Sequence, residues 1–158
     1  MKKIFKIILL CNLLFPHKNS FSQTQQDCLG AIPITNDTII QSFPSPGEGG
    51  IQNEINGSLS CLFSGEKNSS WFSYCVKNSG SLCFSVIPDT LNKDFDWAVF
   101  NLSNAFCSQI YFDSSLEISC NFSNVPGITG LNGLSGSQNE PCLQVNAGEN
   151  MLFALINM

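Results

Sequence analysis

Cysteines are the residues with the clearest capacity for chemistry in this sequence of 158 residues, which contains eight of them. In an oxidising compartment, cysteines spread along a chain in this way form disulfides. A zinc site would need ligands at closer spacing, with more histidines than the single His17. The sequence therefore predicts disulfides. It also predicts one thiol without a partner, because an odd number of cysteines follows residue 22, where the signal peptide predicted below ends. These cysteines are Cys28, Cys61, Cys75, Cys83, Cys107, Cys120 and Cys142.

The most specific disulfide candidate pairs Cys75 with Cys83. Two predicted strands, Trp71–Val76 and Leu82–Ile87, are separated by five residues that include a glycine, which is typical of a β-hairpin. If both strands turn their apolar side chains toward one core, Val76 opposes Leu82 and Cys75 opposes Cys83 on the other face. Opposed positions bring Cβ atoms to roughly 4.5–5.5 Å, near the disulfide range.

Other pairings of these two cysteines stay open at this point. Cys75 and Cys83 could be two free thiols, or each could form a separate bridge to Cys61 or Cys142. The further disulfide candidates are Cys28, Cys61, Cys107 and Cys120.

Asp94 and Asp96 are the candidate metal ligands. Two residues apart on a strand, they point to the same face. Calcium takes six to eight oxygen ligands and tolerates irregular loops, so the pair is a candidate calcium site, although no EF-hand spacing is present. The alternative is that the acidic residues only keep an exported domain soluble. Other oxygen ligands in the chain are Glu48, Glu54, Glu66, Asn68 and Asp113.

Catalytic chemistry has few candidates here. His17, the only histidine, lies in the first eighteen residues, so the remainder of the chain has no histidine base for a serine or cysteine nucleophile. A carboxylate pair such as Asp94 and Asp96 could serve a glycosidase, but the same spacing is more typical of a solvated face, a turn or a cation site. We expect no enzyme activity, no catalytic residue and no organic cofactor.

The charge distribution excludes a basic ligand-binding face. After residue 22 only Lys67, Lys77 and Lys93 remain against twelve acidic residues, which leaves a net charge of −9, and the chain has no arginine. Phosphate-rich partners require clusters of lysine or arginine, so we expect no nucleic acid partner.

The N-terminus has the layout of a signal peptide. Three lysines precede a short apolar run, Ile7–Phe15, and small residues, Ser20 and Ser22, precede a cleavage position before Gln23. The apolar run is about half of the roughly 20 residues that a membrane span needs. We therefore predict residues 1–22 to be a signal peptide, residues 23–158 to be one exported domain, and no transmembrane segment in the mature chain.

Short apolar segments recur through residues 23–158 and favour an all-β domain. They are separated by clusters rich in glycine, proline, asparagine and serine, such as residues 44–50, 78–80 and 126–138, and they lack a 3.6-residue period. Such spacing is typical of an antiparallel β-sandwich. The expected strands are Ala31–Ile34, Thr38–Phe43, Trp71–Val76, Leu82–Ile87, Phe95–Asn101, Leu116–Cys120, Cys142–Val145 and Met151–Ile156.

Aromatic side chains are the other candidate binding surface, because aromatic rings stack on sugar rings. In a sandwich of this size we expect most of them to be buried in the core instead, since aromatics contribute much of the buried area. The candidates are Trp71, Phe72, Tyr74, Trp97, Phe100, Tyr111 and Phe112.

Several stretches together resemble a known family. These are Asp27–Ile34, Cys61–Phe72, Asp94–Phe100, Ser119–Ser123 and Gln138–Cys142. The chain resembles the N-terminal domain of large secreted surface proteins of the Bacteroidota. Those proteins are cargo of the type IX secretion route. They often continue after this domain into PKD- or Ig-like repeats and a gliding-motility-associated sorting domain. The resemblance implies a jelly-roll-like or pre-peptidase-C-terminal-like sandwich and export, and no established activity.

This chain departs from that family in two ways, which concern its odd number of cysteines and its C-terminal end. Family members commonly have a second cysteine where this chain has Thr35, which would account for the odd cysteine count. They also continue beyond the apolar run Met151–Met158 with one more strand, so the resemblance implies that the domain is C-terminally incomplete. A missing strand would leave an open, apolar sheet edge, and we expect such a domain to be poorly soluble or oligomeric.

Two function classes agree with these observations. The first is a non-catalytic extracellular module for adhesion or recognition at the bacterial cell surface, with glycans or other surface proteins as partners. The second is an accessory domain that assists the folding or secretion of a larger secreted hydrolase. The rest of the gene separates them, because a hydrolase domain downstream favours the second class.

Overall fold

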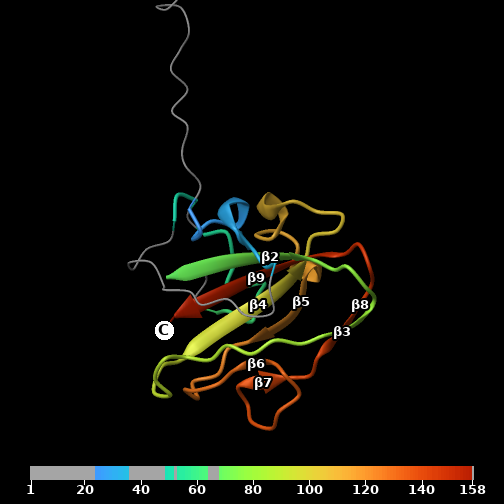
Figure 1. Ribbon diagram of the computed structural model, residues 1–158. Coiled ribbons are helices and arrows are strands. Elements are labelled where there is room, and N and C mark those ends of the chain that lie inside the picture. The colour runs from blue at the N-terminus through green and yellow to red at the C-terminus, as the bar shows by residue number, and fades with distance from the viewer. Residues whose placement is uncertain (1–23, 36–48, 52, 64–67, 158) are drawn as a thin grey trace, which may run out of the picture.

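The computed structural model describes residues 24–35, 49–51, 53–63 and 68–157 (Figure 1). The predicted signal peptide and the predicted strand Thr38–Phe43 lie outside these residues. Among the described residues, no helix is long and apolar enough to span a bilayer.

The described residues form short strands joined by loops and 3-10 turns, so the all-β prediction is confirmed. In chain order the elements are η1 (Cys28–Gly30), β1 (Ile32–Pro33), β2 (Ser69–Cys75), β3 (Gly80–Leu82), β4 (Phe95–Asn101), η2 (Cys107–Gln109), η3 (Ser114–Leu116), β5 (Glu117–Asn121), β6 (Gly130–Leu131), β7 (Asn139–Glu140), β8 (Leu143–Val145) and β9 (Asn150–Asn157).

One five-stranded sheet organises the fold, in the order β1-β2-β9-β4-β5. Its strands are antiparallel except for β1, which runs parallel to β2. Two small sheets, β3-β8 and β6-β7, complete the structure, and β6 and β7 are also parallel. The sheets are therefore small and mixed, whereas the sequence analysis predicted a purely antiparallel arrangement.

Both faces of the five-stranded sheet are buried, which explains its nearly continuous apolar strands. In β4, Trp97 and Val99 pack into one core cluster, and Ala98 and Phe100 pack into another on the opposite face. This alternation is that of a regular strand, in which successive side chains point to opposite faces of the sheet.

Different structures cover the two faces. Loops and 3-10 turns cover the face of Trp71 and Phe100, through buried side chains such as Ile55, Leu62 and Ile110. The small sheets cover the face of Trp97 and Val99. Figure 1 shows the short helices on one side of the sheet and β3, β8, β6 and β7 on the other.

A long antiparallel ribbon connects the large sheet to β3 and β8. The pairing of β2 with β9 runs from Ser69 opposite Ile156 to Cys75 opposite Asn150, and the same register returns where β3 pairs with β8. Between them, the Val76 N–H donates to the Glu149 carbonyl at 2.8 Å. The chain bends there and passes from one layer to the next without a change of register.

The predicted hairpin between Trp71–Val76 and Leu82–Ile87 is wrong, because these two segments do not pair with each other. β2 pairs with β9, and β3 pairs with β8, so the two segments follow one another along the same side of the ribbon. Val76 lies opposite Glu149 and not opposite Leu82. The preference of each strand for a core face was correctly predicted, but the partner comes from residues more than sixty positions away.

The glycine-rich stretch that the sequence analysis assigned to loops contributes strands of its own. β6 and β7 lie at or beside residues 126–138, and the Phe84 N–H donates to the Leu131 carbonyl at 2.9 Å. Gly130, with φ of 143°, lies so close to this segment that a Cβ atom would be 2.3 Å from the Phe84 carbonyl oxygen. Only glycine permits this approach of two backbones.

β9 occupies the centre of the large sheet, with β2 on one side and β4 on the other. Its side chains from Met151 to Ala154 are buried. The exposed apolar surface expected after Met151–Ile156 is therefore not found at this strand. That a further strand follows stays a prediction.

Candidate functional site

Three disulfides link six of the seven described cysteines: Cys28–Cys107, Cys61–Cys120 and Cys83–Cys142. The predicted bridge between Cys75 and Cys83 is wrong, because β2 and β3 do not face each other. One of the alternatives is found, the bridge from Cys83 to Cys142. The prediction of one unpaired thiol among the seven cysteines after residue 22 is confirmed, and it is the exposed Cys75.

Asp94 and Asp96 lie together at the start of β4, as the sequence predicts. Asp96 is only 2% exposed, and its Oδ1 atom has no hydrogen-bond partner. Burial, followed by repulsion from the Asp94 carboxylate, raises the pKa of Asp96 to about 6, although the Ser123 N–H favours the charged form. Burial also raises the pKa of Asp94. The calcium site at this pair stays a prediction.

Two of the other oxygen ligands named from the sequence have structural roles instead. The Glu54 carboxylate accepts a hydrogen bond from the Cys28 N–H at 2.8 Å. The Asp113 carboxylate caps η3 by accepting from the Ser115 N–H. Glu48 and Glu66 lie outside the described residues.

The aromatic candidates divide into buried and exposed groups. Trp71, Trp97 and Phe100 are core residues, as expected, and Phe72 and Tyr74 pack at the edge of the core. Tyr111 and Phe112 are exposed.

The exposed aromatics that the sequence analysis did not name include Phe63 and Phe122. Their rings meet edge to face at 5.8 Å, and the rings of Tyr111 and Phe112 meet similarly at 5.0 Å. We call these four residues the aromatic rim. Nothing in the amino-acid types separates them from the buried aromatics, because exposure depends on which loops cover the sheet.

The loop that carries Phe63 is fixed to the fold from its first residues. The buried Asp27 carboxylate accepts hydrogen bonds from the N–H groups of Gly50 and Ile51, at 2.7 and 2.8 Å, and from Thr24. Burial alone would raise the pKa of Asp27, but these hydrogen bonds together hold it below its usual value. A Cβ atom at Gly49 would be 2.4 Å from the Asp27 carboxylate, so this turn requires glycine.

The far end of the same loop is fixed by Glu117 at the start of β5. Its carboxylate accepts hydrogen bonds from the Ser60 hydroxyl and, at 3.1 Å, from the Cys61 N–H. The Cys61–Cys120 disulfide joins the same two segments covalently. The second disulfide on this face, Cys28–Cys107, holds the neighbouring segment that carries Tyr111.

Between these two segments lies a pocket of about 290 Å³, which we call the loop pocket. Seven residues line it: Asn53, Ile55, Asn56, Gly57, Ser58, Phe63 and Tyr111. The lining includes the buried Ile55 and two members of the aromatic rim, Phe63 and Tyr111. The sequence signal that could have located it is Asn56-Gly57-Ser58, a turn close to a disulfide cysteine.

Local backbone geometry sets the shape of the loop pocket. Asn53 has φ of 60°, a left-handed conformation that asparagine tolerates better than most residues. Asn56 accepts a hydrogen bond from the Ser58 N–H through its side chain at 3.0 Å, and its carbonyl accepts from Leu59 and Ser60. This turn holds the lining in one conformation, since both backbone and side-chain oxygens of Asn56 are used.

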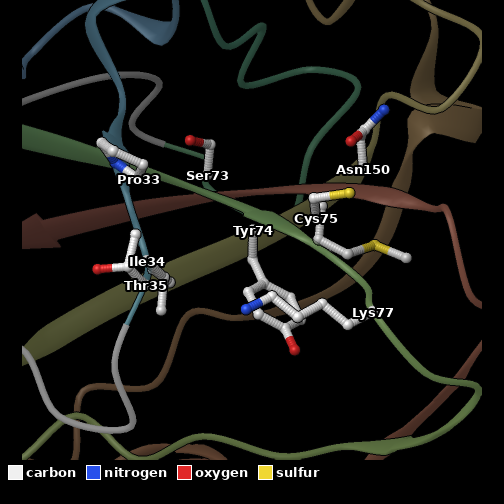
Figure 2. Close-up of a pocket in the computed structure, with 9 residues that line it drawn as sticks. Pro33, Ile34, Thr35, Ser73, Tyr74, Cys75, Lys77 and Asn150 are labelled. Atoms are coloured by element: carbon white, nitrogen blue, oxygen red, sulfur yellow. The ribbon is translucent and has the colours of Figure 1, made fainter.

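A second cavity, of about 320 Å³, lies where β1 separates from β2 after Pro33. Figure 2 shows its lining. Cys75 and Asn150 lie on one side of the β2 backbone and Tyr74 lies on the other, as the alternation of a strand requires. The polar groups of this edge cavity therefore do not converge on one point.

Comparisons of the chain with protein-family models, with curated proteins and with solved structures found no match.

Proposed function

We propose that this chain is a non-catalytic recognition module that works outside the cytoplasm, at the bacterial cell surface. The observation that carries the proposal is the aromatic rim, which is exposed on segments held in place by two disulfides, by the buried Asp27 carboxylate and by the half-buried Glu117 carboxylate. Exposed aromatics on a rigid support are typical of binding surfaces, because little conformational entropy is lost when they bind.

Three disulfides agree with this location, since such bonds persist in oxidising compartments. The signal-peptide layout and the resemblance to secreted surface proteins of the Bacteroidota support it as well. We retain the jelly-roll-like sandwich and the type IX secretion route as parts of the same proposal.

The test is binding of the oxidised, exported domain to an array of bacterial and host glycans, with a parallel array of surface proteins. We expect binding to at least one class, and loss of that binding when Phe63 and Phe112 are both changed to alanine. A domain that melts cooperatively and binds nothing on either array would contradict the proposal. Binding that survives the double substitution would assign recognition to another surface.

A further inference from the structure

We infer that the loop pocket is a subsite for one uncharged sugar residue of a glycan. This inference rests on the proposed recognition function and makes it specific. The pocket of about 290 Å³ is close to the lower end of the volumes at which small-molecule sites occur, which suits a single sugar ring.

The lining offers both kinds of contact that a sugar ring needs. A pyranose has one face of C–H bonds and a rim of hydroxyls. The negative face of an aromatic ring attracts weakly positive C–H bonds, and Tyr111 and Phe63 present such rings at the pocket. The hydroxyl rim requires several donors and acceptors close together.

Those donors and acceptors are present and unused. Within the described part of the chain, no hydrogen bond is found for the Asn53 amide, the Asn56 Nδ2 atom, the Ser58 hydroxyl or the Tyr111 hydroxyl. All four residues line the same pocket, and the hydrogen bonds of the Asn56 turn hold the backbone from Asn56 to Ser60. A polyhydroxylated ligand can bond with them without displacing any interaction of the fold.

The charges around the pocket favour a neutral ligand. No lining residue carries a charge, and the two nearby carboxylates, Glu54 and Glu117, accept hydrogen bonds from Cys28, Ser60 and Cys61. The domain as a whole is acidic, with only three lysines after residue 22, so it repels sugars that bear carboxylate or sulfate groups.

The experiment is saturation-transfer NMR with the oxidised domain and two panels of probes. The neutral panel contains glucose, galactose, mannose and N-acetylglucosamine, and the anionic panel contains glucuronic acid and N-acetylneuraminic acid. We expect transfer to at least one neutral sugar and none to the anionic sugars. Transfer only to the anionic panel, or to neither panel, would overturn the inference.

Substitutions locate the site. Tyr111→Ala removes one ring, and Asn53→Gly removes one amide while keeping the left-handed backbone accessible. We expect each to raise the dissociation constant at least about tenfold. The matched control is Phe106→Ala, an exposed aromatic that is 77% accessible and does not line the pocket.

The outcomes separate this inference from the proposed function. Equal binding by the wild type and by Tyr111→Ala, with both folded, overturns the loop pocket while recognition by the domain stands. Binding on the protein array alone, with no glycan bound, also overturns the sugar subsite and leaves recognition in place. Absence of binding on every array and panel contradicts both.

Discussion

Cys83 and Cys142 occupy opposed positions in one antiparallel ladder, the one that β2 and β9 begin and β3 and β8 continue. Their Cα atoms are 4.8 Å apart, close to the roughly 4.5 Å of a non-hydrogen-bonded antiparallel pair. Cys75 lies in the same ladder opposite Asn150, which is why it has no partner. The register of the ribbon therefore decides which cysteine stays free.

The first prediction concerns the free thiol. Cys75→Ser should change the free energy of unfolding by less than about 0.5 kcal/mol, because it removes no bond from an exposed position. The double variant Cys83→Ser, Cys142→Ser should lose about 2–4 kcal/mol, since the bridge closes a long loop. Urea unfolding measures both. Mass mapping of alkylated peptides from the unreduced protein should find Cys75 labelled and the six bridged cysteines unlabelled.

The second prediction is a pH dependence at Asp96. Its pKa is about 6 in the folded chain against an ordinary 3.8, so the native state holds this proton more tightly than the unfolded state does. The free energy of unfolding should therefore fall as the pH rises from about 4 to about 6, by an amount on the order of 2–3 kcal/mol for this group. Because burial also raises the pKa of Asp94, its ionisation lowers the free energy of unfolding as the pH rises, as that of Asp96 does.

The measurement compares the wild type with Asp96→Asn across that pH range. The variant should be the more stable protein at pH 7, and its curve should lack the loss between pH 4 and 6. Asp113→Asn, at an exposed helix cap, is the matched control and should keep the loss. Parallel curves for the wild type and Asp96→Asn would show that the buried carboxylate does not titrate as stated.

The third prediction is that calcium stabilises the domain through Asp94 and Asp96. An ion at the Oδ1 atom of Asp96, which has no partner, would offset both its burial and the repulsion from Asp94. At pH 7, millimolar calcium should raise the melting temperature of the wild type over that in chelator, because the ion binds only the native state. Asp96→Asn should show no such shift, and an unchanged wild-type midpoint would contradict the site.

The fourth prediction concerns the buried indole of Trp97. Its Nε1 atom donates to the Thr129 hydroxyl at 2.8 Å, and that hydroxyl donates to the Gln138 carbonyl. Thr129→Val keeps the shape but leaves the indole N–H without an acceptor, at a cost of about 1–3 kcal/mol. Thr129→Ser keeps the hydroxyl and is the control. Equal losses in the free energy of unfolding for Thr129→Val and Thr129→Ser, measured in urea, would contradict a role for the hydrogen bond and leave only packing at this position.

The sequence predicts features that depend on neighbouring residues. The bounds and the facing pattern of β4 follow from Phe95–Asn101 alone, because alternation along one strand is a local property. The proximity of Asp94 and Asp96 follows in the same way. Their burial does not, since it depends on how the rest of the fold covers the start of β4.

Features that depend on distant residues were not predictable in the same way. The partner of β2 could not be read from its own residues, because β9 offers it a longer apolar match than β3 does. The loop pocket combines Asn56 with Tyr111, two residues that become neighbours only when their segments are fixed by disulfides and by Glu117. Strands of two residues, such as β6, carry no periodicity at all.

The central position of β9 decides when the large sheet can form during synthesis of the protein. This strand joins β2 to β4, so the large sheet cannot close before residues 150–157 have left the ribosome. Until then the chain holds only fragments of a sheet, and its pairings of high sequence separation make closure slow. A polypeptide whose central strand is made after the four strands around it stays open while those strands are made, and an open chain of this kind can be threaded through a narrow export channel.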